Sequence, residues 1–365
     1  MSQLRVGMSG ARRSGAFMNA FNTVSETKVV ACCDPNPDNL KVFCERWKVK
    51  GYADFDEMID AAKLDLVVVA SPMQFHAPQA ITALKAGAHV LSEVPATVSL
   101  DECWQLLAMV KQTGRKYMMA ENYCYQRPVV LVKAMVEAGL FGELYYAEGA
   151  YIHDVRSMHR NPDGSPTWRV TWQVGRNGCT YPTHSLGPCI QWMKERVKLI
   201  TCLGTGVHTV PHYVNEDTTI MLCKTEQDRL INIRLDMVSN RPHVGNYYAL
   251  QGTKGCFEAA RAAGEQNRVW LEGYAKDSQT WQPLSEFEEK FMPQIWRNPP
   301  EEAKRAGHGG GDYFVVREFV DSILNDAKPP IDIYDSLEYT APGLVSETSI
   351  NQGGVPLPVP DFRVG

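Results

Sequence analysis

The 365-residue chain lacks the patterns that mark several protein classes. No stretch approaches the ~18 consecutive apolar residues of a membrane-spanning helix, and no basic block suits nucleic acid or an anionic membrane surface. The opening Met-Ser-Gln-Leu-Arg lacks the charged region, apolar stretch and cleavage site of an export signal. These absences predict a cytoplasmic protein that binds neither membranes nor nucleic acid.

Disulfide and metal-binding patterns are also missing. The ten cysteines include one adjacent pair, Cys32 and Cys33, and no C-x-x-C motif. In a chain of this length, such scatter predicts reduced, mostly buried thiols. No two of His153, His159, His184 and His212 have the spacing of a His-x-x-x-His helical pair, so we expect no metal site.

The sequence does contain the pattern of a folded protein of about two domains, with 44% apolar residues and a net charge of -5. Over residues 1–125, near-continuous apolar runs alternate with helical patterns, which is typical of parallel strands buried on both faces. The runs are Leu4–Gly7, Val29–Cys33, Leu66–Ala70, His89–Leu91 and Tyr117–Ala120. A helix between the last two is marked by a Ser99/Glu102 capping box and Gly114. We predict an α/β domain with a doubly wound parallel sheet, the Rossmann arrangement.

The pattern changes in residues 126–365. Leu230–Met237 alternates apolar with polar side chains, as in an antiparallel sheet with one covered face. Further strand candidates are 143–152, 200–205, 218–223 and 247–251. We therefore predict a second, α+β domain with an open, mainly antiparallel sheet, for substrate binding and oligomerisation.

A dinucleotide site is predicted after the first strand. Gly10 and Gly15 occupy the first and third positions of G-x-G-x-x-G, and Arg12 replaces the middle glycine. Asp34, about 20 residues later, is placed to accept ribose hydroxyls, which favours NAD over NADP. Alternatively, Arg12 and Arg13 pair with the extra phosphate of NADP. A tight turn without ligand, with Asp34 capping a helix, is the third possibility.

Three segments resemble the Gfo/Idh/MocA oxidoreductase family: 70–76 (Ala-Ser-Pro-Met-Gln-Phe-His), 87–95 (Gly-Ala-His-Val-Leu-Ser-Glu-Val-Pro) and 139–144 (Gly-Leu-Phe-Gly-Glu-Leu). Val94 stands where dehydrogenases of this family usually carry a proton-transferring lysine. The resemblance and the glycine loop together imply cofactor contacts from Gly10, Arg12, Arg13, Gly15, Asp34, Ser71, Pro72, Gln74, His76, Glu93 and Asn122.

Five ordered motifs are similar to a narrower subgroup, the NAD-dependent glycosidases, whose best-known members act on α-N-acetylgalactosaminides. They are 93–96 (Glu-Val-Pro-Ala), 118–125, 148–156, 181–188 (Tyr-Pro-Thr-His-Ser-Leu-Gly-Pro) and 308–312 (His-Gly-Gly-Gly-Asp). This resemblance implies a carbohydrate substrate and tightly bound NAD. It also implies transient oxidation at sugar carbon 3, elimination, water addition and re-reduction. The alternatives are a net sugar or polyol dehydrogenase and a catalytically inert NAD- and sugar-binding regulator.

Four residues are the predicted catalysts. Tyr181 and His184 lie three apart in an expected helical turn, so their side chains should face the same way. The resemblance suggests Tyr181 as a base and His184 as a binding or proton-relay group. His153 follows a strand, and Glu121 lies at the carboxyl end of the last strand of the first domain, where ligands bind. Either one is a candidate to protonate the leaving oxygen or to act on water.

Candidate substrate contacts combine aromatic and charged side chains: Tyr151, Asp154, Arg156, Trp168, Arg176 and His308. The alternative for Asp154 and Arg156 is a structural ion pair, and Asp312 is expected to cap a helix at 313–324. Relatives of this type associate through the open sheet face, so we expect a homodimer or homotetramer involving Leu230–Met237.

Overall fold

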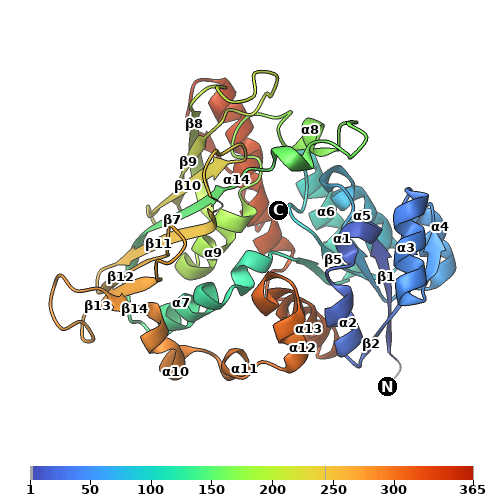
Figure 1. Cartoon of the computed structure of the whole chain (residues 1–365), viewed down its shortest axis with the longest axis horizontal. Coiled ribbons are helices and arrows are strands. Elements are labelled where there is room, and N and C mark those ends of the chain that lie inside the picture. Colours follow the sequence, from blue (N-terminus) through green and yellow to red (C-terminus); the bar gives the residue numbers. More distant parts are fainter. Residues whose placement is uncertain (1–2, 243, 365) are drawn as a thin grey trace. The chain divides into compact units, whose positions relative to one another are not determined.

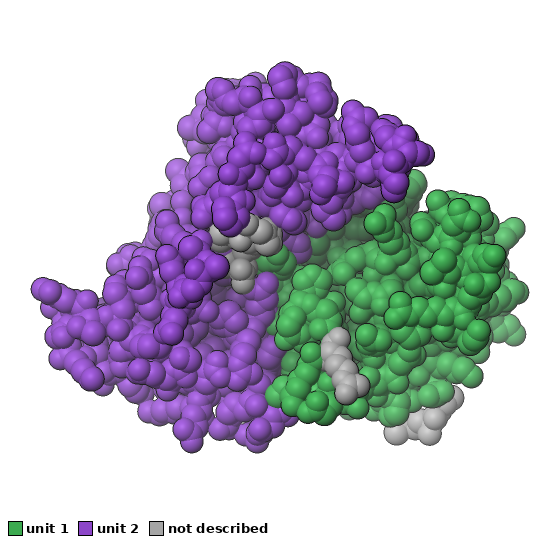
Figure 2. All heavy atoms as spheres, viewed as in Figure 1, with its two compact units in different colours: residues 1–125, 299–337, 362–365 green, residues 126–298, 338–361 purple. Residues whose placement is uncertain are grey.

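The computed structural model describes residues 3–242 and 244–364. The chain forms two compact units, coloured separately in Figure 2. Unit 1 comprises residues 1–125, 299–337 and 362–365, and unit 2 comprises 126–298 and 338–361. Within the described residues, no helix is both long and apolar enough to cross a membrane.

Unit 1 contains a six-stranded parallel sheet in the order β3-β2-β1-β4-β5-β6. Figure 1 labels β1, β2 and β5 of this sheet. The strands are β1 (Leu4–Ser9), β2 (Thr27–Cys33), β3 (Lys50–Tyr52), β4 (Leu66–Val69), β5 (His89–Ser92) and β6 (Tyr117–Met119). All four residues of β4 are fully buried, as its unbroken apolar run predicts. The strand order reverses between β1 and β4, which confirms the doubly wound sheet.

The helices of unit 1 are α1 (Ala11–Ser14), α2 (Met18–Thr23), α3 (Pro37–Trp47), α4 (Phe55–Ala62), α5 (His76–Lys85), α6 (Leu100–Thr113), α12 (Glu301–Arg305) and α13 (Gly311–Leu324). Three of them, α3, α4 and α6, begin at side-chain N-caps. The Ser99 hydroxyl accepts the Glu102 N–H at the start of α6, and Gly114 ends this helix with φ 63°. The Glu102 carboxylate accepts the Val98 N–H, one residue before the position that a standard capping box uses.

Unit 2 is built on a nine-stranded sheet in the order β14-β13-β12-β11-β7-β10-β9-β8-β15. The strands are β7 (Leu144–Ile152), β8 (Val197–Gly204), β9 (Thr219–Thr225), β10 (Leu230–Asp236), β11 (Val244–Gly252), β12 (Gly255–Glu258), β13 (Arg268–Leu271), β14 (Gln282–Pro283) and β15 (Leu357–Pro358). Only β7 and β10 pair in parallel, so the predicted mainly antiparallel sheet is confirmed. Ile231, Ile233 and Leu235 are buried, as their alternation predicts.

The helices of unit 2 are α7 (Arg127–Glu137), α8 (Arg169–Trp172), α9 (Thr183–Met193), α10 (Glu288–Phe291) and α11 (Gln294–Arg297). Helix α9 packs against β7, β10 and β11. Gly149 of β7 makes this approach possible, because a Cβ there would lie 2.5 Å from the Ser185 carbonyl oxygen. Helix α14 (Ile333–Asn351) contributes its first residues to unit 1 and the remainder to unit 2.

Candidate active site

The point of unit 1 where the strand order reverses lies between β1 and β4, where open α/β sheets bind ligands. Gly10, directly after β1, has φ 85°, and a Cβ there would lie 2.4 Å from the Ala70 carbonyl oxygen after β4. Only glycine suits this position, because both the backbone conformation and the space exclude a side chain. Helix α1 is one turn long, so the predicted phosphate loop leads into a short helix.

Asp34 lies at the carboxyl end of β2, as the sequence predicts. Its two carboxylate oxygens accept the N–H groups of Ala11 and Asn36, each at 2.9 Å. Asn36, and not Asp34, caps α3. Each Asp34 oxygen keeps a second acceptor site, which suits ribose hydroxyls.

Arg13 pairs with Glu93, which follows β5. The Arg13 Nε atom lies 2.5 Å from Glu93 Oε1, and Glu93 Oε2 accepts the Val94 N–H. Three strand spacings, about 14 Å, separate β5 from β2. Arg13 is therefore held away from Asp34, where the extra phosphate of NADP would bind, and this supports the prediction of NAD. Arg12 is exposed.

Hydrogen bonds to the Gln79 side chain of α5 hold the loop after β4 in place. The hydroxyls of Ser9 and Ser71 both donate to Gln79 Oε1, at 2.7 and 2.8 Å. His76 is buried, with each ring nitrogen 2.8 Å from a carbonyl oxygen, of Pro95 and Ser71. Burial lowers the pKa of His76. The Ser71 and His76 side chains thus connect the loops after β4 and β5, while Pro72 and Gln74 are half-buried.

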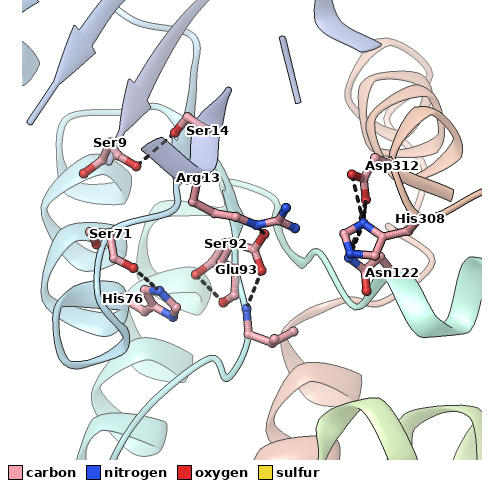
Figure 3. Close-up of polar contacts among 11 residues, drawn as sticks. Ser9, Arg13, Ser14, Ser71, His76, Ser92, Glu93, Asn122, His308 and Asp312 are labelled. Atoms are coloured by element: carbon pink, nitrogen blue, oxygen red, sulfur yellow. Dashed lines mark hydrogen bonds and ion pairs between the residues drawn. The ribbon is translucent and has the colours of Figure 1, made fainter. Parts of the chain in front are cut away.

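A second polar cluster in unit 1 consists of Asn122, His308 and Asp312, which lie far apart in the sequence (Figure 3). Asp312 in the first turn of α13 is fully buried, and both its carboxylate oxygens lie within 3.1 Å of His308 Nδ1. Asn122, just after β6, places Nδ2 3.1 Å from the same ring nitrogen. The expectation that Asp312 caps this helix is wrong, because the N-cap is Gly310 and the carboxylate binds His308.

Glu121 lies between β6 and Asn122 and is fully buried. Its Oε1 accepts the Tyr123 N–H at 3.1 Å. Glu121 therefore lies where the sequence predicts it, at the carboxyl end of the last parallel strand. It also shows that the carboxylate helps to hold the turn that follows.

The residues of this edge fit NAD. Gly10 lets the backbone after β1 approach the loop after β4 closely, and Asp34 offers carboxylate oxygens at the end of β2. Two buried oxygens of the same edge, Gln74 Oε1 and Asn122 Oδ1, have no hydrogen-bond partner among the described residues. Such atoms are costly to bury unless a ligand or water donates to them.

In unit 2, four predicted residues form one aromatic cluster: Tyr151, His153, Tyr181 and His184. The Tyr151 hydroxyl lies 2.8 Å from His153 Nδ1. The rings of Tyr181 and His184 meet edge to face with centroids 5.2 Å apart, and Tyr151 lies 5.5 Å from His184. The residues come together although α9 begins at Thr183, so Tyr181 precedes the helix instead of starting it.

The remaining predicted substrate contacts of unit 2 have other partners in the structure. Arg156 binds Asp154 and Asn240, which is the structural ion pair that the sequence left open. Arg176 pairs with Glu347 of α14 at 2.5 Å. The Trp168 ring is covered by the Arg169 guanidinium, 4.5 Å from its centroid.

Asp312 and Gln79 are the site residues that sequence reasoning missed. The Gly-Gly-Gly run before Asp312 signalled an unusual backbone, but nothing in it indicated that the carboxylate would turn back to His308. Gln79 lies inside α5, where no local pattern separates it from an ordinary exposed helix residue.

Comparison with known proteins agrees with this geometry. Residues 4–121 match the family model "Oxidoreductase family, NAD-binding Rossmann fold" of the Gfo/Idh/MocA group, and residues 125–365 match "Glycosyl hydrolase 109, C-terminal domain". The resemblances seen in the sequence are therefore confirmed.

Individual relatives support the same family. A glycosyl hydrolase family 109 protein of Shewanella pealeana is 30% identical, covering all of this chain and 86% of its own. An alpha-N-acetylgalactosaminidase of Shewanella oneidensis shows the same identity and coverage. A similar fold occurs in the WlbA dehydrogenase of Bordetella pertussis, crystallised with NADH and UDP-GlcNAcA, with a TM-score of 0.77, 18% identity and 99% of each chain covered. The chain belongs to glycosyl hydrolase family 109, with an NAD-binding Rossmann domain at its amino end.

Proposed function

We propose that this protein hydrolyses a glycoside, of which an α-N-acetylgalactosaminide is the first candidate, with no net consumption of NAD. The name of the Shewanella oneidensis relative supports the sugar, and membership of the family supports the bond that is cleaved. When bound, NAD supplies a reversible hydride acceptor for carbon 3 of the sugar. All other steps are proton transfers that the chain must perform.

In unit 1, the proposed task is to hold the cofactor. Asp34 binds a ribose, Gly10 admits the diphosphate, and the Arg13–Glu93 pair fixes the loop after β5. Val94 is buried and has no ionisable group. The lysine chemistry of related dehydrogenases is therefore absent at this position, and proton transfer falls to other residues.

In unit 2, the proposed task is to move protons on the sugar. Oxidation at carbon 3 leaves a ketone, which acidifies the hydrogen on carbon 2. Tyr181 removes that proton, the bond from carbon 1 to the glycosidic oxygen breaks, and His153 protonates the leaving oxygen. Water then adds to carbon 1 and gives its proton to His153, Tyr181 returns its proton to carbon 2, and the ketone is reduced. His184 accepts and returns the proton of the carbon 3 hydroxyl.

The observation that carries this proposal is the contact among the four rings of the aromatic cluster. Tyr181 and His184 meet at 5.2 Å, and the Tyr151–His153 hydrogen bond orients a second imidazole beside them. A base and its neighbouring proton acceptor need such proximity, because both act on one substrate. Sequence spacing alone brings only Tyr181 and His184 together. The fold adds Tyr151 and His153 from the end of β7.

The test follows aglycone release and reduced nicotinamide together, using the protein as purified, without added cofactor, on α- and β-aryl glycosides including α-N-acetylgalactosaminide. We expect many turnovers of aglycone without accumulation of NADH. NADH that accumulates from free sugars without bond cleavage would identify a net dehydrogenase. A protein that binds NAD and sugar but is inactive in both assays would be a regulator.

We further propose that the protein is a cytoplasmic homodimer or homotetramer that associates through the open sheet face. Leu230 of β10 and Leu222 of β9 lie on the same outward face and are 37% and 41% exposed. Apolar side chains exposed side by side on a sheet support such an interface. Light scattering at micromolar concentration tests it, and a monomeric mass would contradict it.

A further inference from the structure

We propose that His308 donates a hydrogen bond from Nε2 to the carboxamide oxygen of the nicotinamide ring of NAD, and that Asp312 and Asn122 are the positioning residues for this contact. The inference goes beyond the glycosidase proposal and rests only on NAD binding by unit 1. It assigns His308 to the cofactor, where the sequence suggested the substrate.

The Asp312 carboxylate fixes which His308 nitrogen carries a proton. Both carboxylate oxygens lie within 3.1 Å of Nδ1, and a carboxylate can only accept, so Nδ1 must donate. Because Asp312 is fully buried, the hydrogen bond and the charge also raise the pKa of His308 and favour the doubly protonated ring. Nε2–H then remains as the outward-facing donor of a side chain that is 36% exposed.

Asn122 holds the same arrangement from the sheet. Its Nδ2 lies 3.5 Å from Asp312 Oδ1 and 3.1 Å from His308 Nδ1, so both donors converge on one carboxylate oxygen. Asn122 follows β6, while Asp312 belongs to α13, 190 residues later. The cluster therefore ties the carboxyl edge of the sheet to the start of this helix.

The loop backbone is shaped around the buried carboxylate. His308 adopts φ 54°, a conformation that non-glycine residues rarely take, and Gly309 and Gly310 follow with φ 66° and 97°. A Cβ on Gly307 would lie 2.4 Å from Asp312 Oδ2. A strained conformation held by its surroundings commonly marks a functional position.

The position along the sheet indicates the nicotinamide half of the cofactor. Asp34 marks the adenosine ribose at β2, and a dinucleotide crosses the carboxyl edge from that half of the sheet to the other. Asn122 at β6 and Glu93 at β5 belong to the opposite half. In Figure 3 the His308 ring and the Arg13–Glu93 pair are drawn in one view of this edge.

The test is a competition between cofactors, read out as the cofactor that the protein retains. Purified protein is equilibrated with equal amounts of NAD and thionicotinamide adenine dinucleotide, whose C=S group is a poor acceptor. After gel filtration, the bound cofactor is quantified by mass spectrometry. We expect wild type to retain NAD with a preference of roughly tenfold, as one charge-assisted hydrogen bond allows.

The variants His308→Asn and Asp312→Asn should lower this preference to within about twofold. Asparagine tolerates the left-handed backbone of position 308, so His308→Asn keeps the test valid if Asp312→Asn fails to fold. Asp321→Asn, on the exposed part of the same helix, is the matched control and should keep the wild-type preference. Competition with 3-acetylpyridine adenine dinucleotide, which retains the C=O group, should not change among these variants.

A wild type without preference for NAD over the thio analogue would overturn the contact. A preference that survives in His308→Asn would do the same. If the preference is lost in His308→Asn but kept in Asp312→Asn, the positioning role of Asp312 is wrong. None of these outcomes depends on glycoside cleavage, so they are distinguishable from a failure of the proposed function.

Discussion

Two histidine-containing groups in this protein are held in place by opposite means. In unit 1, His308 is bound by a buried carboxylate, which fixes the proton on Nδ1. In unit 2, His184 contacts the faces and edges of Tyr151 and Tyr181. An ionic partner favours one protonation state of a ring, whereas aromatic packing fixes the position of a ring.

This difference matches the two tasks in the proposed function. A cofactor that stays bound needs partners that keep their positions throughout the cycle. A sugar that is oxidised, cleaved and reduced needs groups that gain and lose protons in each cycle. The comparison predicts that variants of unit 1 change cofactor binding, and that variants of the aromatic cluster change turnover.

The strongest test of the comparison is Tyr181→Phe. Loss of the hydroxyl removes the proposed base while the ring still packs against His184, so we expect kcat to fall by about 10²–10⁴-fold with bound NAD retained. Tyr146→Phe, a hydroxyl deletion on β7 outside the cluster, is the control and should remain active. Loss of bound NAD from the Tyr181→Phe variant would contradict the separation between cofactor binding in unit 1 and turnover in the aromatic cluster.

A smaller effect is expected from Asp34→Asn. The change removes a charged acceptor from the end of β2 and keeps an oxygen for one of the two neighbouring N–H groups, so NAD should bind roughly tenfold more weakly. Isothermal titration with cofactor-stripped protein measures the affinity, and aryl glycoside assays at saturating NAD measure kcat. A large drop in kcat at saturation would show that Asp34 acts on turnover as well.

The protonation of His308 gives a third test. Its pKa is raised above 6.5 by Asp312, so the imidazolium stabilises the folded state below that pH, and the contribution is lost as pH rises through the raised pKa. Solvent screening keeps it below about 1 kcal/mol for a side chain this exposed. NMR of ring-labelled histidine should show the titration moving to lower pH in Asp312→Asn. An unchanged titration would show that the charge of Asp312 does not raise the pKa of His308.

The smallest effect is expected at Arg156→Gln. The guanidinium binds Asp154 and Asn240, and both members of the ion pair are at least one-third exposed, so the pair stabilises the fold by less than about 1 kcal/mol. We expect KM for the aryl glycoside to change by less than about twofold. A tenfold rise in KM would show that Arg156 contacts the substrate.

Much of the fold is predictable because its signals are local. The fully apolar run of β4 and the caps of α6 specify their elements without reference to distant residues. The short strands β3, β13 and β14 lie at or next to a sheet edge and have no such pattern, because their two to four residues depend on a neighbouring strand for pairing.

The candidate site is less predictable because its contacts join distant segments. The sequence identified Tyr181 and His184 as a pair, yet it attributed their approach to a helix that begins after Tyr181. The Asn122–Asp312 contact spans 190 residues, and no spacing rule reports it. His76 illustrates the converse, since its motif suggested a ligand contact while burial gives both ring nitrogens to carbonyl oxygens.

The interleaved path of the chain has a consequence for synthesis in the cell. The last segment of unit 1 begins at Phe362, which is buried and whose ring lies 4.7 Å from that of Trp104. At about 5–20 residues per second, a ribosome that has completed the parallel sheet needs roughly 12–48 s more to supply this closing residue. During that interval the nascent Rossmann sheet is exposed without its last covering segments, so we expect this protein to depend on chaperones during translation.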